Sequence, residues 1–190
     1  HRQRNESNCL VAQSLALKSK PGTGNSPKFA QLCRMSSSLL SIHSDENYMH
    51  QALLEAELAF ADDEVPIGAV VVCNNRIIGR GHNQVERLHD ATAHAEMLAI
   101  TAASDFLGSK YLEGCTLYVT IEPCPMCAGA LRWVQLEKVV YGAGESKFGY
   151  TRFGPEMLHP KTEVVHGILE NECRQLMRSF FQNKRGQDRQ

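Results

Sequence analysis

The sequence lacks a long hydrophobic run and carries almost no net charge. Its longest apolar stretch, residues 67–73, is far shorter than the roughly 20 residues that a membrane-spanning helix needs. The apolar residues near the N-terminus are scattered among Ser, Lys and Arg, so they do not form the core of a secretory signal. With 190 residues, 43% of them hydrophobic and 22% charged, the chain has the composition of one globular domain with a hydrophobic core.

The net charge of −1 hides an asymmetry between the two ends of the chain. Residues 1–35 contain six Lys or Arg and one acidic residue, whereas the remainder contains 14 basic and 20 acidic residues. An acidic domain is not typical of a general nucleic-acid binder. An RNA partner therefore requires a local basic patch, for which Arg178, Lys184 and Arg185 are candidates.

The seven cysteines do not have the spacing of a disulfide-rich secreted domain. Cys124 and Cys127 form one close pair, which indicates metal or redox chemistry. The other five occur singly, and a closed structural zinc site needs a fourth ligand that they do not readily supply. These single cysteines are Cys9, Cys33, Cys73, Cys115 and Cys173.

Residues 1–44 show no usable periodicity and are predicted to be disordered or weakly ordered. Residues 1–34 have two interpretations: a Ser-rich, acid-poor transit-like presequence, or translated sequence upstream of a start at Met35. The folded domain is expected over residues 45–190. We expect a cytoplasmic protein, or an organellar one if residues 1–34 are a genuine transit peptide.

From Asp45 onward, helices and strands alternate around an opening hairpin, and Asp45 itself is a candidate cap for the first helix. This alternation predicts a three-layer α/β/α domain with a mixed sheet. The strands are expected at residues 66–73, 76–81, 116–121, 138–141 and 162–166, and the helices at 45–60, 93–103, from about 124, and 170–184.

Two short motifs carry the chemistry. Cys124 and Cys127 share one face of a helix that Pro123 suits as an entry residue, and thiolates are stabilised at a helix N-terminus. His94 would be a third zinc ligand, which leaves a fourth position for water. Glu96 can reach that water only if the site lies at the N-terminal end of its helix. Alone, His-x-Glu matches by chance, and Cys-x-x-Cys also fits a redox pair; together they point to a catalytic zinc site.

The joint pattern His-x-Glu with Pro-Cys-x-x-Cys resembles the zinc-dependent nucleobase deaminases. Over about residues 45–185 the chain is most similar to the tRNA adenosine deaminases (the TadA family). Ala91 departs from the proline common in that family, and residues 149–161 differ from several relatives. The matching stretches are residues 64–70, 90–96, 117–124, 127–130 and 167–173, followed by Phe180 and Phe181.

The resemblance implies a cytidine-deaminase-like fold with a central five-stranded sheet. It implies one Zn²⁺ per subunit, a homodimer, a tRNA anticodon stem-loop as partner and conversion of the wobble adenosine to inosine. Glu96 would carry protons between the attacking water, N1 of adenine and the departing amine.

The resemblance also makes Asn83 a substrate contact, although a turn asparagine is the alternative. Lys147 is a candidate phosphate contact or an ordinary solvated lysine. Phe181 is a candidate for stacking near the flipped base or for core packing.

Two rival functions remain at this point. A deaminase of free guanine, or of another nucleobase or nucleoside, would share the chemistry. Guanine deaminases tend to have Gly-Pro-Phe-Gly where this chain has residues 65–68, Val-Pro-Ile-Gly, and many cytidine deaminases use three cysteines where this chain has His94. A non-catalytic zinc-stabilised subunit is the second rival, and the presence of Glu96 argues against it.

Overall fold

The computed structural model describes residues 40–187, so of residues 1–44, predicted to be disordered or weakly ordered, residues 1–39 lie outside the described part and residues 40–44 lie within it. A short 3-10 helix, η1 (Leu40–His43), precedes the first long helix, α2 (Asp45–Ala61). The N-cap of α2 is Ser44, whose hydroxyl accepts a hydrogen bond from the Asn47 N–H at 3.2 Å. The expectation that Asp45 caps this helix was wrong, because its carboxylate accepts hydrogen bonds from Tyr118 Oη and Lys138 Nζ instead.

The predicted hairpin is formed by β1 (Gly68–Cys73) and β2 (Arg76–His82). Asn74 and Asn75 connect the two strands with φ angles of 48° and 60°. Positive φ at both central residues matches the right-handed twist of the flanking strands, and asparagine tolerates that conformation better than most residues. The two asparagines therefore fix the hairpin's register.

Three more strands complete the sheet, in the order β2-β1-β3-β4-β5. β1 is antiparallel to both β2 and β3, whereas β3, β4 and β5 are mutually parallel. The predicted five-stranded mixed sheet between helical layers is confirmed. The added elements are β3 (Cys115–Ile121), β4 (Lys138–Ala143), β5 (Glu163–His166), α3 (Val85–Leu88), α4 (Ala95–Leu107), α5 (Pro125–Val134) and α6 (Glu170–Gln187), with two 3-10 turns, η2 (Tyr150–Arg152) and η3 (Pro155–Met157).

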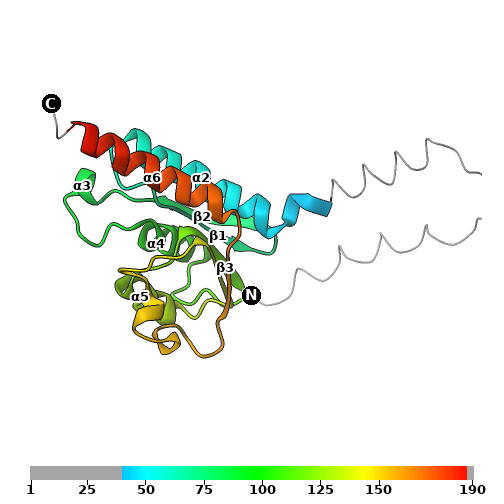
Figure 1. Cartoon of the computed structure of the whole chain (residues 1–190). Helices are drawn as coiled ribbons and strands as arrows, with labels where there is room; N and C mark the ends of the chain where they lie inside the picture. Colours follow the sequence, from blue (N-terminus) through cyan, green and yellow to red (C-terminus); the bar gives the residue numbers. More distant parts are fainter. Residues whose placement is uncertain (1–39, 188–190) are drawn as a thin grey trace, which may run out of the picture. The chain divides into compact units, whose positions relative to one another are not determined.

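The sheet has two differently packed faces. Val70 and Val72 point to the face covered by α2 and α6, whereas Ala69 and Val71 point to the face covered by α4 and α5. Figure 1 shows α2 and α6 side by side on one face, with α4 and α5 on the other. Alternation along β1 thus separates two cores, each closed by a pair of helices. Within the described chain, no helix combines the length and apolarity needed to cross a membrane.

Candidate metal centre and substrate pocket

The two helices on the α4/α5 face each begin at a motif residue. His94 is the N-cap of α4, and Cys124 is the N-cap of α5. In each case the backbone carbonyl accepts the first helical hydrogen bond, from Leu98 N–H at 3.1 Å and from Ala128 N–H at 2.8 Å. Neither side chain makes the usual capping bond. The His94 imidazole and the Cys124 thiol therefore remain available to bind a metal ion.

The proline in the first turn of α5 is not the one that we expected there. Pro125 occupies the first turn of the helix, where its missing N–H costs nothing. Pro123, which we expected at the helix entry, lies before the N-cap, and its carbonyl accepts a hydrogen bond from Tyr150 N–H at 3.0 Å. Pro123 therefore links the start of the helix to the following loop.

The spacing of the three motif donors is that of a zinc site. His94 Nδ1 lies 3.6 Å from Cys124 Sγ and 3.5 Å from Cys127 Sγ, and all three donor atoms lie within 4.8 Å of one another. Zn–S and Zn–N bonds of about 2.3 and 2.0–2.1 Å at a tetrahedral angle place S and N about 3.6 Å apart. The residues thus fit three ligands of a tetrahedral zinc with a fourth position free.

Close contact between α4 and β2 fixes the position of His94. A Cβ added to Gly81 would lie 2.5 Å from the Ala95 carbonyl oxygen and 2.7 Å from the Ala99 nitrogen. At Gly79 the corresponding distance to the Ala99 carbonyl oxygen is 2.3 Å. Only glycine lets the helix backbone approach the strand this closely. The start of α4 is consequently held against the sheet.

Glu96 is buried in the first turn of α4 beside the thiol of Cys127. Burial raises the pKa of its carboxyl to about 7, which is the range expected of a group that both accepts and donates protons near neutral pH. A hydrogen bond with Cys127 and, to a smaller extent, one with His94 lower the pKa of the Cys124 thiol to about 4. The centre therefore favours a thiolate at Cys124, and thiolates are good zinc ligands.

Asn83 lies next to this centre. It follows β2, its N–H donates to the Ile67 carbonyl at 2.9 Å, and the next N–H, that of Gln84, donates to the Ala93 carbonyl at 3.0 Å. Asn83 and His94 line the same cavity of about 760 Å³, which also includes Glu64, Ile67 and Phe181 in its wall. We call this cavity the substrate pocket. Its size is in the range of small-molecule and cofactor sites.

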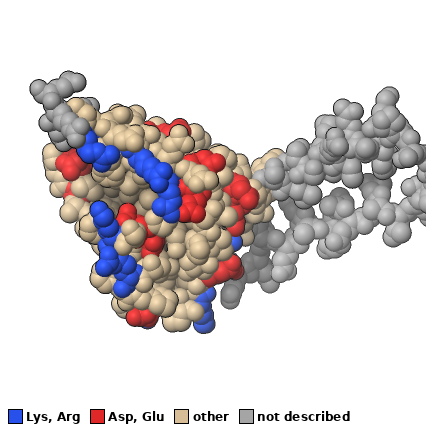
Figure 2. All heavy atoms as spheres, viewed as in Figure 1, with Lys and Arg blue, Asp and Glu red and all other residues tan. Residues whose placement is uncertain are grey.

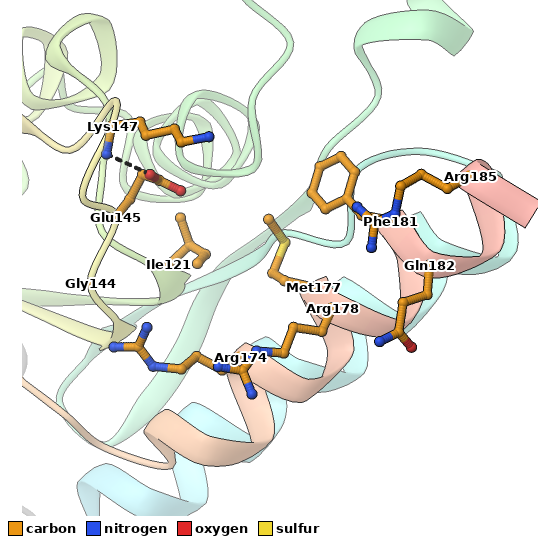
Figure 3. A pocket seen from close by; sticks show the side chains of 10 residues that line it. All are labelled: Ile121, Gly144, Glu145, Lys147, Arg174, Met177, Arg178, Phe181, Gln182 and Arg185. Atoms are coloured by element: carbon orange, nitrogen blue, oxygen red, sulfur yellow. Dashed lines mark hydrogen bonds between the residues drawn. The ribbon is translucent and has the colours of Figure 1, made fainter.

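Lys147 does not line the substrate pocket but a neighbouring cavity of about 480 Å³, the basic groove. The groove lies between the loop after β4 and helix α6, and Arg174, Arg178 and Arg185 also line it. In Figure 3, Lys147 extends from the loop on one side, while the arginines and Phe181 come from α6 on the other. Figure 2 shows Lys and Arg side chains gathered in bands on this face of the molecule.

Phe181 lines both cavities. Its side chain is exposed and stacks edge-on against Phe180, which is buried and contacts Phe60 in turn. Phe180, and not Phe181, is therefore the residue that packs in the core. Of the candidate patch residues, Arg178 and Arg185 line the groove, whereas Lys184 lines the substrate pocket and pairs with Asp63 at 2.5 Å.

Glu122, for which no local motif predicted a role, is buried two residues before Cys124. Its carboxylate accepts hydrogen bonds from Glu145 N–H at 2.9 Å, Thr151 N–H at 3.0 Å and Thr151 Oγ1 at 2.7 Å. A Cβ on Gly149 would lie 2.3 Å from this carboxylate. Glu122 therefore ties both ends of the Lys147 loop to the entry of α5.

The chain matches a known family of zinc-binding proteins. Residues 42–143 match the family model described as the cytidine and deoxycytidylate deaminase zinc-binding region. The tRNA-specific adenosine deaminase of Bacillus subtilis (strain 168) is 48% identical over 146 residues, which cover 74% of this chain and 91% of that protein.

Two solved structures are also similar. One comes from a study of A-to-I editing by tRNA:A34 deaminases at the wobble position of transfer RNA; it has a TM-score of 0.64 and 41% identity, covering 68% of this chain and 97% of its own. The guanine deaminase of Bacillus subtilis has a TM-score of 0.53 and 38% identity, covering 57% and 73% of the two chains. The longer coverage of the first structure favours the tRNA-acting group.

Proposed function

The chain belongs to the tRNA-specific adenosine deaminases, a group of zinc-dependent hydrolytic enzymes, and from this premise we propose how its residues convert the wobble adenosine of a tRNA anticodon loop to inosine. The observation that supports the proposal most strongly is the spacing of His94 Nδ1 from the two cysteine sulfurs, 3.6 and 3.5 Å, beside a buried Glu96. His94, Cys124 and Cys127 are the proposed zinc ligands.

Zinc bound to these three residues supplies Lewis acidity, which lowers the pKa of a water molecule enough to make it a nucleophile near neutral pH. Glu96 holds that water by its carboxylate and passes one of its protons to N1 of adenine as the water oxygen bonds to C6. It then passes the second proton from the new C6 hydroxyl to the amine, and the C6–N bond breaks. Burial matches this role, because a carboxyl with a pKa of about 7 exchanges protons readily in both directions. Ammonia and inosine are the products.

Substrate recognition is assigned to the two cavities. Asn83 contacts the flipped nucleotide in the substrate pocket, and Phe181 lies where a base can stack. Lys147 and the arginines of α6 contact phosphates in the basic groove. An anticodon stem-loop suits this arrangement, because unpaired loop bases can leave their stack more cheaply than bases in a duplex.

The test is an assay of the purified zinc-loaded protein on an anticodon-loop RNA, with inosine detected in the digested product and guanine assayed in parallel. We expect inosine at the wobble position and no ammonia from guanine. Ammonia from guanine, or from another free base or nucleoside, without inosine in the RNA would overturn the tRNA substrate and support the alternative of a small-molecule deaminase.

A homodimer is the proposed assembly. Three exposed aromatic side chains on α5 and the following loops support it, with exposed fractions of 78% for Trp133, 69% for Phe148 and 59% for Phe153. Exposed aromatic groups are enriched at interfaces between subunits. Sedimentation of the protein should give a dimer, and Trp133→Ala should shift it toward monomer. A monomeric wild-type protein at micromolar concentration would contradict this assembly.

We propose that the enzyme works in the cytoplasm, with residues 45–190 as the catalytic domain. Import into an organelle is the alternative if residues 1–34 act as a transit peptide. Fluorescent fusions of the full chain and of a chain without residues 1–34 distinguish the two, because only a transit peptide makes their locations differ.

A further inference from the structure

Glu64 is a nearly fully buried acid in the wall of the substrate pocket, with 1% of its surface exposed. Both oxygens of its carboxylate accept hydrogen bonds. Oε2 accepts a hydrogen bond from Asn83 Nδ2 at 3.0 Å, and Oε1 accepts one from the Arg87 N–H at 2.8 Å. Glu64 thus joins the segment after α2 to the end of β2 and to α3.

This contact determines which end of the Asn83 amide faces Glu64. A carboxylate accepts hydrogen bonds and has none to donate, so the amide must turn its NH₂ group toward it. Asn83 Oδ1 makes no hydrogen bond within the described part of the chain. In the described part of the chain, the only fully buried side-chain nitrogen or oxygen without a hydrogen-bond partner is His82 Nε2. Asn83 Oδ1 also has no partner there, so it is not fully buried. Asn83 Oδ1 is therefore accessible, and Asn83 lines the pocket together with His94.

We propose that Glu64 is a positioning residue that fixes the Asn83 amide so that its carbonyl oxygen faces the substrate. The inference rests on the proposed function, in which Asn83 contacts the target nucleotide. A pocket that presents a fixed acceptor selects a substrate group that can donate. The ring nitrogens N1, N3 and N7 of adenine cannot donate. The matching groups are the exocyclic amine of the base and the ribose 2′-hydroxyl.

Replacing one atom of Glu64 reverses this arrangement. In Glu64→Gln, the amide oxygen still accepts from the Arg87 N–H, while an NH₂ group takes the place of Oε2. Two NH₂ groups then face each other, so Asn83 must turn its oxygen toward Gln and its NH₂ group into the pocket. The pocket changes from acceptor to donor with little change of volume.

A second substitution restores the acceptor. In the double variant Glu64→Gln with Asn83→Asp, one oxygen of the aspartate accepts from the glutamine and the other faces the pocket. Asn83→Asp alone places two buried carboxylates against each other, which is strongly unfavourable. The structure therefore predicts that either single variant is impaired and that the pair together is better than both.

The experiment measures kcat and KM for inosine formation in an anticodon-loop RNA, with zinc content and Tm for each variant. We expect Glu64→Gln to lower kcat/KM about 10- to 100-fold, the range of a misplaced buried hydrogen bond, mainly through KM and with zinc retained. Asn83→Asp should lose more, and the double variant should recover at least tenfold over Asn83→Asp and exceed Glu64→Gln. Glu57→Gln, the same change on an exposed face of α2, is the control and should match wild type.

Two results would overturn the proposal. One is an unchanged KM in Glu64→Gln with a lowered Tm, which is the mark of a purely structural role. The other is a double variant whose Tm recovers while kcat/KM does not. An RNA with 2′-deoxyadenosine at the target position identifies the donor: if the donor is the 2′-hydroxyl, wild type rejects this RNA and Glu64→Gln discriminates less. If the donor is the amine, discrimination is the same in both.

A failure of the proposed function has a different signature. Wild type would then make no inosine in RNA but would release ammonia from a free base. The same variants can be compared on that base, so the role of Glu64 is tested independently of the substrate class.

Discussion

The two faces of the sheet contribute different parts of the function. The α4/α5 face holds the candidate metal centre, with His94 and Cys124 each at the start of a helix, and close packing against β2 fixes the backbone of α4. The α2/α6 face contributes the rim, where exposed charges on α6 meet the loop after β4. The α4/α5 face fixes the positions of a few donor atoms, whereas the α2/α6 face carries charged side chains along α6. In the proposed function, catalysis depends on the first arrangement and affinity for the RNA on the second.

The largest effect is expected from removing a metal ligand. Cys127→Ala should reduce inosine formation to background, because a site with two protein ligands binds zinc weakly. Metal analysis and thermal denaturation should show loss of zinc and a lower Tm. Cys173→Ala removes an equally buried thiol from α6 on the other face. That variant should keep both zinc and activity, and loss of zinc from it would contradict the division between the faces.

Removal of the proposed proton carrier separates catalysis from metal binding. Glu96→Ala should lower kcat by about 10²- to 10⁴-fold or more, the usual contribution of general acid–base catalysis. Zinc should remain at one per subunit, because Glu96 is not among the three ligands. Single-turnover inosine formation and metal analysis test both points. Substantial residual activity would mean that another group carries the protons.

A smaller effect is expected from separating α4 from the sheet. Gly81→Ala places a Cβ 2.5 Å from the Ala95 carbonyl oxygen, and such overpacking costs about 1–3 kcal/mol. The Tm should fall by several degrees, with lower kcat because His94 and Glu96 flank Ala95. Gly129→Ala in α5 is the matched control, since a Cβ there meets nothing within 4 Å. It should stabilise the protein by about 0.5–1 kcal/mol; equal losses in both variants would contradict the close-contact explanation.

The smallest effects are expected at the rim. Lys147→Ala and Arg178→Ala should each raise KM for the RNA while leaving kcat nearly unchanged. Each should also reduce the slope of log affinity against log salt concentration by about 0.7, the value for one phosphate contact on a single strand. Lys110→Ala removes an exposed lysine that stacks on Tyr111 outside both cavities. Its salt dependence should equal that of wild type.

The metal centre was largely predictable because its information is local. Cys124 and Cys127 are three residues apart, and His94 and Glu96 are two apart, so each motif fixes its own geometry once a helix begins there. The sheet was predictable for the same reason, since β-strand alternation and the Asn74–Asn75 turn are local signals. Element ends were correct to within a few residues, and the last helix extends three residues beyond the expected Lys184.

The roles of Glu64 and Glu122 were not predictable, because both depend on partners far along the chain. Glu64 contacts Asn83, 19 residues away, and Glu122 contacts Thr151, 29 residues away. No local pattern distinguishes a buried acid with such partners from a solvated one. The same limit explains Phe180 and Phe181, which are adjacent in sequence but differ in burial. Phe180 packs against Phe60 and lines only the substrate pocket, whereas the more exposed Phe181 lines both cavities.

The attachment of the Lys147 loop at both ends has a consequence for protein engineering. Glu122 holds Glu145 at one end and Thr151 at the other, while residues 146–148 between them are exposed. Residues 146 and 147 can therefore be varied as a library while Glu122, Phe148, Gly149 and Thr151 are kept, because Phe148 is one of the proposed interface residues. In the proposed function, such a library changes how the loop contacts the RNA backbone and leaves the hydrolytic step intact, so new substrate preferences can be selected without changing the catalytic residues.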